Sequence, residues 1–467
     1  MTKTRTEHDL LGDYEVPASA YWGVHTGRAR ENFPISGVPI GHYRSLIKAL
    51  ALVKVAAARA NVGCGVLDSK LADPLIAAAL EVADGKLDGE FVVDAIQGGA
   101  GTSTNMNANE VIANRALELM GFAKGEYQHL HPLNHVNMSQ STNDVYPTAV
   151  KLATVMEIKN LIVALKHLAA AFTRKAEEFS HVIKMGRTQL QEAVPMTLGQ
   201  EFATFARMIG EDVQRLEECI PLLGEINLGG TAIGTQLNAP AGYAQMACAF
   251  LRDLTDDLPL TVATDMVEAT QDTGVFVMVS GVIKRTAVKL SKISNDLRLL
   301  SSGPRAGLNE INLPARQAGS SIMPGKVNPV IPEVVNQIAF AVVGNDMTIT
   351  MASEGGQLQL NAFEPIICRA MMMSLTQLTS GCYTLADRCV DGITANVDRL
   401  RESVANSIGL VTALAPMLGY EAATEVAQRA AAEDKTVREV VLELGLMSAD
   451  EFEAVLGDVE RLTRPAR

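Results

Sequence analysis

The chain contains several apolar patterns of helical period that run far beyond the length of an ordinary helix. In residues 144–180, apolar side chains recur at three- and four-residue spacing over about ten turns of about 3.6 residues. Similar patterns cover residues 197–223, 265–300, 332–352 and 362–391, whereas the mean globular helix has about 11–12 residues. Many are apolar on more than one face, as at residues 338–343, and must be covered on all sides. We therefore predict a long helix bundle whose excess apolar surface packs against other subunits.

The composition also favours helices over sheets. Hydrophobic residues make up 48% of the 467 residues and charged residues 20%, while aromatic residues are only 4%. A chain of this length suggests about three domains of about 150 residues each. We predict a mainly α fold with an N-terminal domain (1–142), a central long-helix bundle (143–395) and a small helical C-terminal domain (396–467). Over about the first 40 residues we expect an extended arm with short turns, followed by helices at 43–60, 69–84 and 105–120. In the C-terminal domain, shorter helices break at Gly409, Gly419 and Gly445.

The net charge argues against nucleic-acid binding, and the cysteines indicate the redox compartment in which the protein works. The net charge is -13 and no dense Lys/Arg run occurs, which excludes the basic patch of a nucleic-acid binder. The six cysteines form no C-x-x-C and lie in apolar segments, as free thiols in a reducing compartment do. The N-terminus is polar, and no run of about 18 apolar residues appears. We therefore predict a cytoplasmic protein without a membrane span.

Four polar loops interrupt the apolar helices, and loops on a rigid helical scaffold usually carry the chemistry. The most informative reads Gly319-Ser-Ser-Ile-Met-Pro-Gly-Lys-Val-Asn-Pro329. Its glycines allow a lid that closes and excludes water, and Lys326 beside Asn328 suits a carboxylate. A serine there becomes a base only if backbone N–H groups and a nearby cation stabilise its oxyanion. By composition alone, a flexible Gly-Ser linker is an equally good interpretation.

The other three loops each have a structural and a functional interpretation. Gly98-Gly-Ala-Gly-Thr-Ser-Thr-Asn105 could cradle an anion, or form a helix-entry turn capped by Thr or Ser. Ser139-Gln-Ser-Thr-Asn-Asp144 could hold a carboxylate at a positive helix terminus, or simply cap the first long helix. Met185-Gly-Arg-Thr-Gln189 supplies Thr, Gln and a cation near a predicted helix start, and is uninformative alone.

Histidines and carboxylates add little on their own. His129, His131 and His135 fit no standard zinc spacing, so we interpret them as exposed loop residues and predict no metal site. Asp144 and Glu333 are candidate acids, but both could equally cap helices or pair with arginine.

Taken together, these loops resemble the aspartase/fumarase superfamily. The resemblance covers nearly the whole chain from Asp9, and the stretch 319–329 matches the mobile loop of that superfamily residue for residue. Three places resemble the ammonia-lyases acting on L-aspartate more than the fumarases: His25 where fumarases tend to have Gln, Thr142 where they usually have Ser, and Gln189 where they have a His that activates water with a Glu. The residues 437–441 are also closer to the ammonia-lyases.

The resemblance implies an activity and a role for each site residue. It implies reversible deamination of L-aspartate to fumarate through an aci-carboxylate, with no cofactor and with Ser320 as the base that takes the C3 proton. Thr102, Ser141, Thr142 and Ser321 would bind the β-carboxylate. Lys326 and Asn328 would bind the α-carboxylate, while Asn143 and Thr188, with Gln189, would hold the amino group. It further implies a homotetramer whose active sites are built from three chains.

Three alternatives stay open at this stage. A class II fumarase-type hydratase of fumarate and L-malate is the nearest, a lyase acting on another N-substituted aspartate follows, and a non-enzymatic helical scaffold is the most distant. One departure concerns residues 131–138, where Leu133-Asn134 replaces the common Asn-Asp and Met138 stands where fumarases commonly have Lys. The accessory anion site that fumarases form there is therefore in doubt.

Overall fold

The computed structural model describes residues 3–464, which group into two compact units. The first unit holds the chain up to Ile162 together with Gln214–Arg285 and Phe340–Gln377. The second unit holds Val163–Val213, Thr286–Ala339 and the chain from Leu378 onward. Among the described residues, no helix combines the length and the apolar character that a membrane span requires.

Five long helices pass through both units and confirm the predicted mainly α fold. They are α5 (Thr142–Glu178), α6 (Leu198–Leu222), α9 (Gly274–Leu300), α10 (Val330–Glu354) and α11 (Glu364–Arg388). In the first unit, Ser280 and Lys284 of α9 both bond to Asp346 of α10, at 2.8 and 2.6 Å. In the second unit, Phe172 of α5 packs against Phe202 and Phe205 of α6. Helix-to-helix packing of this kind is what the long apolar periodicity predicted.

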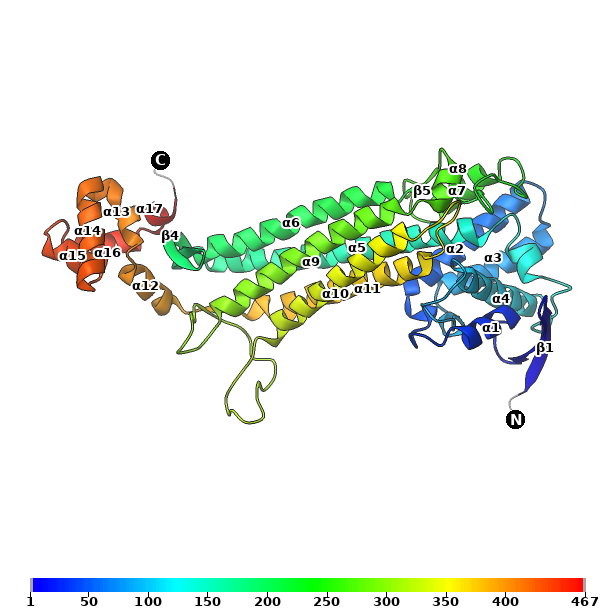
Figure 1. The fold of residues 1–467 in the computed structure, drawn as a ribbon, viewed down its shortest axis with the longest axis horizontal. Coiled ribbons are helices and arrows are strands. Elements are labelled where there is room, and N and C mark those ends of the chain that lie inside the picture. Colours follow the sequence, from blue (N-terminus) through cyan, green and yellow to red (C-terminus); the bar gives the residue numbers. More distant parts are fainter. Residues whose placement is uncertain (1–2, 465–467) are drawn as a thin grey trace. The chain divides into compact units, whose positions relative to one another are not determined.

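The first unit also contains shorter helices packed around α2. These are α2 (Arg44–Gly63), α3 (Ser69–Ala83), α4 (Thr102–Leu119) and α7 (Tyr243–Asp253), and they lie side by side in Figure 1. Between them are η1 (Ile40–His42), η2 (Asp88–Glu90), η3 (Pro132–Val136) and the two-residue strands β5 (Glu225–Ile226) and β6 (Thr261–Val262). Helix α2 is buried along most of its length because Ala, Leu and Val fill all its faces.

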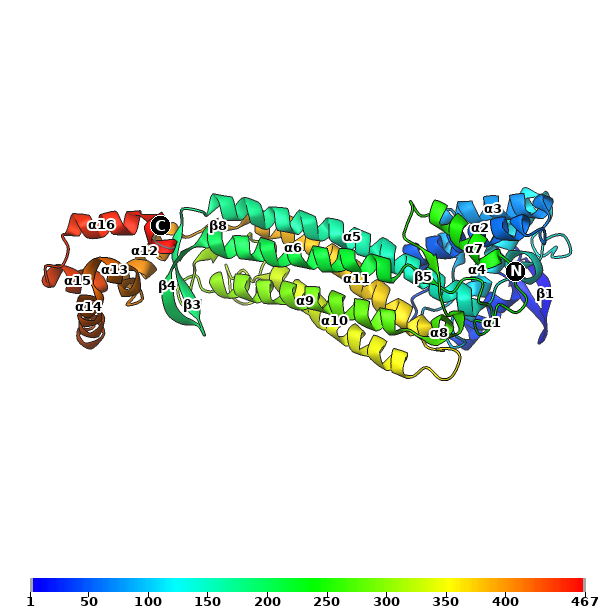
Figure 2. The ribbon, with the colours of Figure 1, turned by 90° about the horizontal axis from the view of Figure 1, so that it is seen from above.

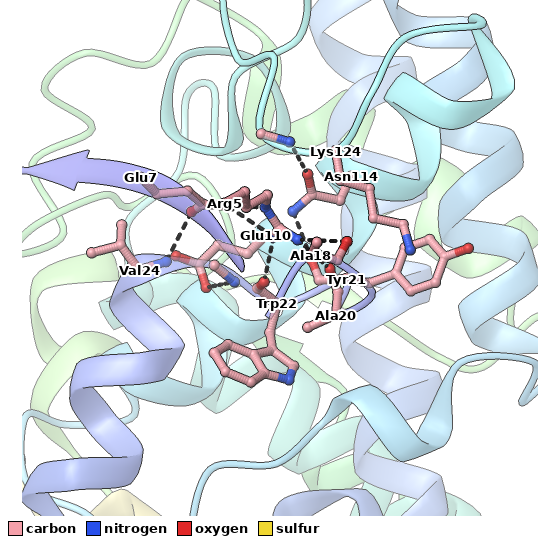
Figure 3. Close-up of polar contacts among 12 residues, drawn as sticks. Arg5, Glu7, Ala18, Ala20, Tyr21, Trp22, Val24, Glu110, Asn114 and Lys124 are labelled. Carbon is pink, nitrogen blue, oxygen red and sulfur yellow. Dashed lines mark hydrogen bonds and ion pairs between the residues drawn. The ribbon is translucent and has the colours of Figure 1, made fainter. Parts of the chain in front are cut away.

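The expected extended arm is instead a β-hairpin followed by a helix. Strands β1 (Thr4–Asp9) and β2 (Gly12–Pro17) pair antiparallel, and α1 spans Val24–Asn32. The buried carboxylate of Glu110 on α4 accepts the backbone N–H groups of Gly23, His25 and Thr26. The carboxylate of Glu7 on β1 accepts that of Val24 (Figure 3). These acceptors satisfy the unpaired donors of the first turn of α1. Because they come from distant residues, local sequence gave no signal for this helix.

A second difference from the sequence prediction lies at residues 265–300, where one helix was expected. The structure has α8 (Met266–Gln271), a break, and then α9. At the break Asp272 is extended, with φ -78° and ψ 128°, and its carboxylate accepts the backbone N–H of Gly274. This side-chain bond competes with helical hydrogen bonding, as Asp commonly does at helix ends.

The second unit contains a β-hairpin packed against the C-terminal helices (Figure 2). Strands β3 (Ile183–Thr188) and β4 (Gln191–Thr197) pair antiparallel, and Ile183 and Met185 enter the apolar core of the C-terminal helices. Those helices are α12 (Val397–Asn406), α13 (Leu410–Leu418), α14 (Tyr420–Glu433), α15 (Val437–Glu443), α16 (Ala449–Gly457) and α17 (Val459–Thr463). The predicted breaks at Gly409, Gly419 and Gly445 are confirmed. Strands β7 (Ile311–Asn312) and β8 (Thr394–Ala395) also pair, and η4 spans Val390–Gly392.

Candidate active site

The loop between β7 and α10 folds back on itself and carries the predicted catalytic serine. The backbone N–H of Gly319 donates to the carbonyl of Lys326 at 2.8 Å, and the Asn328 side-chain amide donates to the carbonyl of Gly319 at 2.9 Å. A Cβ at position 319 would lie 2.6 Å from the Lys326 carbonyl oxygen, so this close approach requires glycine. The loop is thus closed at its base by residues 319, 326 and 328.

Ser320 Oγ accepts hydrogen bonds from the backbone N–H groups of Ile322 and Met323, at 3.1 and 3.0 Å. Such donors stabilise negative charge on the oxygen and lower the cost of forming an alkoxide. Lys326 contributes a cation from the same short loop. The two N–H donors supply one of the two conditions under which a serine hydroxyl can act as a base without a histidine, and Lys326 is the cation of the same loop that could supply the other.

Thr188 and Gln189 lie at the tip of the β3–β4 hairpin, not near a helix start as the sequence suggested. Thr188 pairs with Gln191, and the two residues between them, Gln189 and Leu190, have φ of 55° and 65°. Two consecutive left-handed residues make the tight turn that matches the twist of a hairpin. Both Thr188 and Gln189 are exposed, so their side chains are available to a ligand.

In the first unit, the start of α5 gathers three of the predicted site residues. Ser141 Oγ accepts the backbone N–H of Asn143, and Thr142 Oγ1 accepts the side-chain amide of Asn105 at 3.1 Å. Asn143 in turn donates to the carbonyl of Ala232 at 2.7 Å. The helix cap expected at this position is confirmed for Ser141, whose hydroxyl bonds the first turn of α5.

The glycine loop before α4 is held in a rarely populated conformation and presents Thr102. Three consecutive residues, Gly99, Ala100 and Gly101, have φ of 90°, 52° and 89°. The expected Thr or Ser cap is not what satisfies the helix: the Gln97 side chain accepts both the N–H and the hydroxyl of Thr104. The hydroxyl of Thr102 is therefore not needed as the cap, and the residue is exposed at the start of α4.

A buried lysine that the sequence interpretation missed lies behind this group. Lys54, in the interior of α2, is fully buried and donates to Asn105, Asn137 and Gln140 at 2.8, 3.0 and 2.8 Å. Burial lowers its pKa to about 7, while the charge of Asp144 acts to raise it. Two successive hydrogen bonds, through Asn105, link this lysine to the hydroxyl of Thr142. A charged residue inside the otherwise apolar run 49–58 was the signal that could have revealed it.

Asp144 and the loop histidines have structural contacts. The Asp144 carboxylate accepts backbone N–H groups of Ser141, Gly229 and Thr231, and burial raises its pKa to about 7. His131 is half-buried, not exposed, and caps η3, while His135 accepts the N–H of His131. Burial lowers the pKa of both histidines. No metal-binding group of His, Cys, Asp or Glu occurs among residues 3–464.

The predicted site residues thus form two groups. Thr102, Ser141, Thr142 and Asn143 belong to the first unit, and Thr188, Gln189, Ser320, Ser321, Lys326 and Asn328 belong to the second. Within each group, hydroxyl and amide donors lie at loop and helix ends.

Comparison with protein families identifies the class of protein. The family model described as Lyase matches residues 12–344, and that described as Fumarase C C-terminus matches residues 410–464. The chain therefore belongs to the lyase family of the aspartase/fumarase superfamily.

The most informative comparison within that family is the sequence identity with individual enzymes. The chain is 58% identical to the aspartate ammonia-lyase of Pseudomonas fluorescens, over 98% of this chain and 95% of the relative. Identity with the Escherichia coli K12 aspartate ammonia-lyase is 54%, over 99% and 96%. This chain thus groups with the aspartate ammonia-lyases, as the resemblance predicted.

Solved structures confirm the fold. A fumarate lyase:delta crystallin from Brucella melitensis, bound to cobalt, has 54% identity and a TM-score of 0.95, covering 99% of this chain and all of that one. A class II fumarase from Schistosoma mansoni has 36% identity and a TM-score of 0.91, covering 98% and 99%. The fumarase is therefore more distant in sequence than the relatives above, although its fold is nearly the same.

Proposed function

We propose that the protein catalyses the reversible deamination of L-aspartate to fumarate and ammonia, as a carbon–nitrogen lyase, with Ser320 as the catalytic base. The observation that carries the assignment of the base is the pair of backbone N–H groups donating to Ser320 Oγ. They stabilise the alkoxide that must take the C3 proton of the substrate. Family membership and the identity to aspartate ammonia-lyases support the reaction.

Each remaining residue binds one group of the substrate in this proposal. Thr102, Ser141, Thr142 and Ser321 donate hydroxyls to the β-carboxylate, and Asn143, Thr188 and Gln189 hold the amino group. Lys326 and Asn328 bind the α-carboxylate. One N–H of the Asn328 amide is used within the loop, which leaves the second for the substrate.

The hydroxyl donors suit the intermediate that the reaction requires. Removal of the weakly acidic C3 proton places extra negative charge on the adjacent carboxylate, as an aci-carboxylate. Preorganised donors aimed at that group are each worth about 3 kcal/mol in a site that excludes water. Ammonia leaves in the second step. Because the hydroxyl donors stabilise the intermediate, the route needs no cofactor.

The competing hydratase assignment is less well supported. It would require a residue that activates water, which fumarases form from a His and a Glu. Here Gln189 stands at the position of that His, and an amide side chain does not act as a base near neutral pH. Glu333 is present at the start of α10 but lacks that partner in the sequence.

We further propose a cytoplasmic homotetramer whose active sites are each built from residues of three chains. Helix α10 exposes a stripe of large apolar side chains, Phe340, Val343, Met347 and Met351, at 66%, 43%, 61% and 60%. Their three- and four-residue spacing places them on one helix face, which is typical of an interface. All six cysteines are free thiols, which supports a reducing compartment.

A single assay tests the proposed reaction. The ultraviolet absorbance of fumarate is followed with L-aspartate and then with L-malate, for the wild type and for Ser320→Ala. We expect product from aspartate only, and loss of a general base should lower kcat by about 10²–10⁴-fold. Product from malate but not from aspartate would overturn the ammonia-lyase assignment. Unchanged turnover by Ser320→Ala would overturn the proposed base while leaving the reaction in place.

A further inference from the structure

A buried cluster of four charged side chains lies between the β3–β4 hairpin and the chain segment that leads to the Ser320 loop. We call Lys184, Arg187, Glu201 and Glu310 the hairpin ion cluster. Glu310 bridges the two cations: its carboxylate lies 2.8 Å from Lys184 Nζ and 2.5 Å from an Arg187 guanidinium nitrogen. Lys184 also pairs with Glu201 at 2.6 Å. All four residues belong to the second unit.

The cluster is largely shielded from water and carries no net charge. The side chains of Lys184 and Glu310 are 2% and 1% exposed, and those of Arg187 and Glu201 are each 21% exposed. Buried ion pairs are weak contributors to stability, because apolar residues of similar volume often stabilise a fold as well or better. In some proteins such pairs instead fix a geometry, because each buried charge must meet its partners.

A β-bulge brings Lys184 and Arg187 to the same carboxylate. In a regular strand, residues three apart point to opposite faces of the sheet. The pairing register of β3 shifts between Met185 and Arg187, at Gly186, which re-aims the following side chain. A Cβ on Gly186 would lie 2.9 Å from the Val194 carbonyl oxygen, so this close pairing leaves little room there for any other residue.

One end of the cluster adjoins a residue of the proposed active site, and the other end lies on the segment that leads to the Ser320 loop. Arg187 immediately precedes Thr188, at the tip of the hairpin. Glu310 immediately precedes β7, from which the chain continues into the loop that bears Ser320. The backbone of Glu310 is itself fixed, because its N–H donates to Leu300 and its carbonyl accepts from Asn396. The opposite face of β3 is anchored as well, by Ile183 and Met185 in the C-terminal core.

We propose that Lys184 and Glu310 are positioning residues that hold Thr188 and Gln189, at the tip of the hairpin, in the orientation that binds the amino group. This inference rests on the proposed function, in which the hairpin tip binds the amino group. Loss of the Glu310 charge removes the ion pair that holds Arg187, so the adjoining hairpin tip shifts. The effect falls on binding of the amino group or of ammonia, and only weakly on the carboxylates.

The test uses the reverse reaction, amination of fumarate, in Glu310→Gln. We expect KM for ammonium to rise by about tenfold to a hundredfold, as small misplacements of binding groups do. KM for fumarate should change by less than about threefold, since carboxylate binding is assigned to other residues. A purely structural role would lower the active fraction, and so kcat, without separating the two KM values.

A matched control is Asp346→Asn, which removes another largely buried carboxylate from an ion pair, that with Lys284 in the first unit. It should leave the ratio of the two KM values unchanged. If Glu310→Gln does not fold, Arg187→Met removes a partly exposed member of the cluster and should raise KM for ammonium in the same way.

The experiment distinguishes failure of the positioning role from failure of the proposed reaction. A wild type that releases no fumarate from aspartate refutes the function. An active wild type with unaltered KM for ammonium in Glu310→Gln, or an equal rise in both KM values, refutes the positioning role alone.

Discussion

The Lys54 ammonium donates a hydrogen bond of 2.8 Å to the side-chain oxygen of Asn105, inside the core of the first unit. The amide of Asn105 donates to the hydroxyl of Thr142, a residue of the proposed β-carboxylate site. A buried cation therefore sets which way the Asn105 amide points, because its oxygen must face Lys54. The orientation of the Thr142 hydroxyl follows from that, leaving its proton free to point elsewhere.

Lys54→Met tests the electrostatic coupling between Lys54 and Asp144. Asp144 is fully buried, and the charge of Lys54 acts to lower its pKa. Lys54→Met also leaves the side-chain oxygens of Asn105, Asn137 and Gln140 without their donor, a loss of about 1–3 kcal/mol in the free energy of unfolding. Chemical denaturation of Lys54→Met, Asp144→Asn and the double variant measures the coupling energy between the two residues. We expect the double variant to lose less than the sum of the single variants; simple additivity would mean that the two charges are independent.

Gly101→Ala tests whether the strained loop before α4 admits only glycine. Gly101 has φ of 89°, and a Cβ there would lie 2.5 Å from the ring of Tyr146. The left-handed conformation costs a non-glycine residue about 1–2 kcal/mol, and displacing the ring adds about 1–3 kcal/mol. Gly121, at the other end of the same helix, has φ of 86° but nothing within 4 Å of an added Cβ.

Gly121→Ala is therefore the control, because it carries the conformational cost alone. Thermal denaturation should rank the variants with Gly101→Ala clearly less stable. We also expect Gly101→Ala to raise KM for aspartate, since Thr102 follows directly. Equal losses of stability in the two variants would rule out the steric conflict with Tyr146.

The helices were predictable from sequence because their signal is local. The long apolar periods gave four of the five long helices to within a few residues, and α2, α3 and α4 were also placed. The exception is the period 265–300, which the structure divides into α8 and α9. Elements held by distant partners were not predictable. Helix α1 depends on Glu7 and Glu110, and Thr188 lies on a hairpin whose strands carry few strand-forming residues.

The candidate site was predictable only in part, for the same reason. The residues of the loop 319–329 are adjacent in sequence, so the donors around Ser320 could be anticipated. Lys54 is distant in sequence from Asn137 and Gln140, and only the fold brings them together. The division into domains at residues 142 and 395 stays a prediction.

Phe340→Glu tests the proposed subunit interface on α10. A carboxylate in an apolar contact would have to be desolvated without a partner, which weakens association strongly. We expect size-exclusion chromatography with light scattering to show dissociation from a tetramer, with activity lost in parallel because the sites are shared. Leu10→Glu, at a fully exposed hairpin tip, is the control and should remain assembled. An unaltered mass for Phe340→Glu would exclude this stripe as an interface.

Glu110→Gln tests the pH dependence of the carboxylate that holds the start of α1. Burial, chiefly, and the nearby charge of Glu7 raise the pKa of Glu110 to about 7, although its hydrogen bonds act to lower it. Between its ordinary pKa of 4.5 and about 7, the folded state holds this proton more firmly than the unfolded chain does. The stabilisation is complete below pH 4.5 and is lost as the pH rises through about 7, by at most about 3 kcal/mol.

Glutamine does not titrate, so the comparison isolates this contribution. As the pH rises from 5 to about 7.5, the melting temperature of the wild type should fall relative to that of Glu110→Gln. Glu118 lies on the same helix, and its pKa is lowered, mainly by the hydrogen bond from Tyr21. For Glu118→Gln the difference should stay nearly constant from pH 5 to about 7.5 and should move in the opposite direction below about pH 4.5, because that stabilisation is lost as the pH falls. A pH-independent difference for Glu110→Gln would mean that the carboxyl keeps an ordinary pKa in the folded protein.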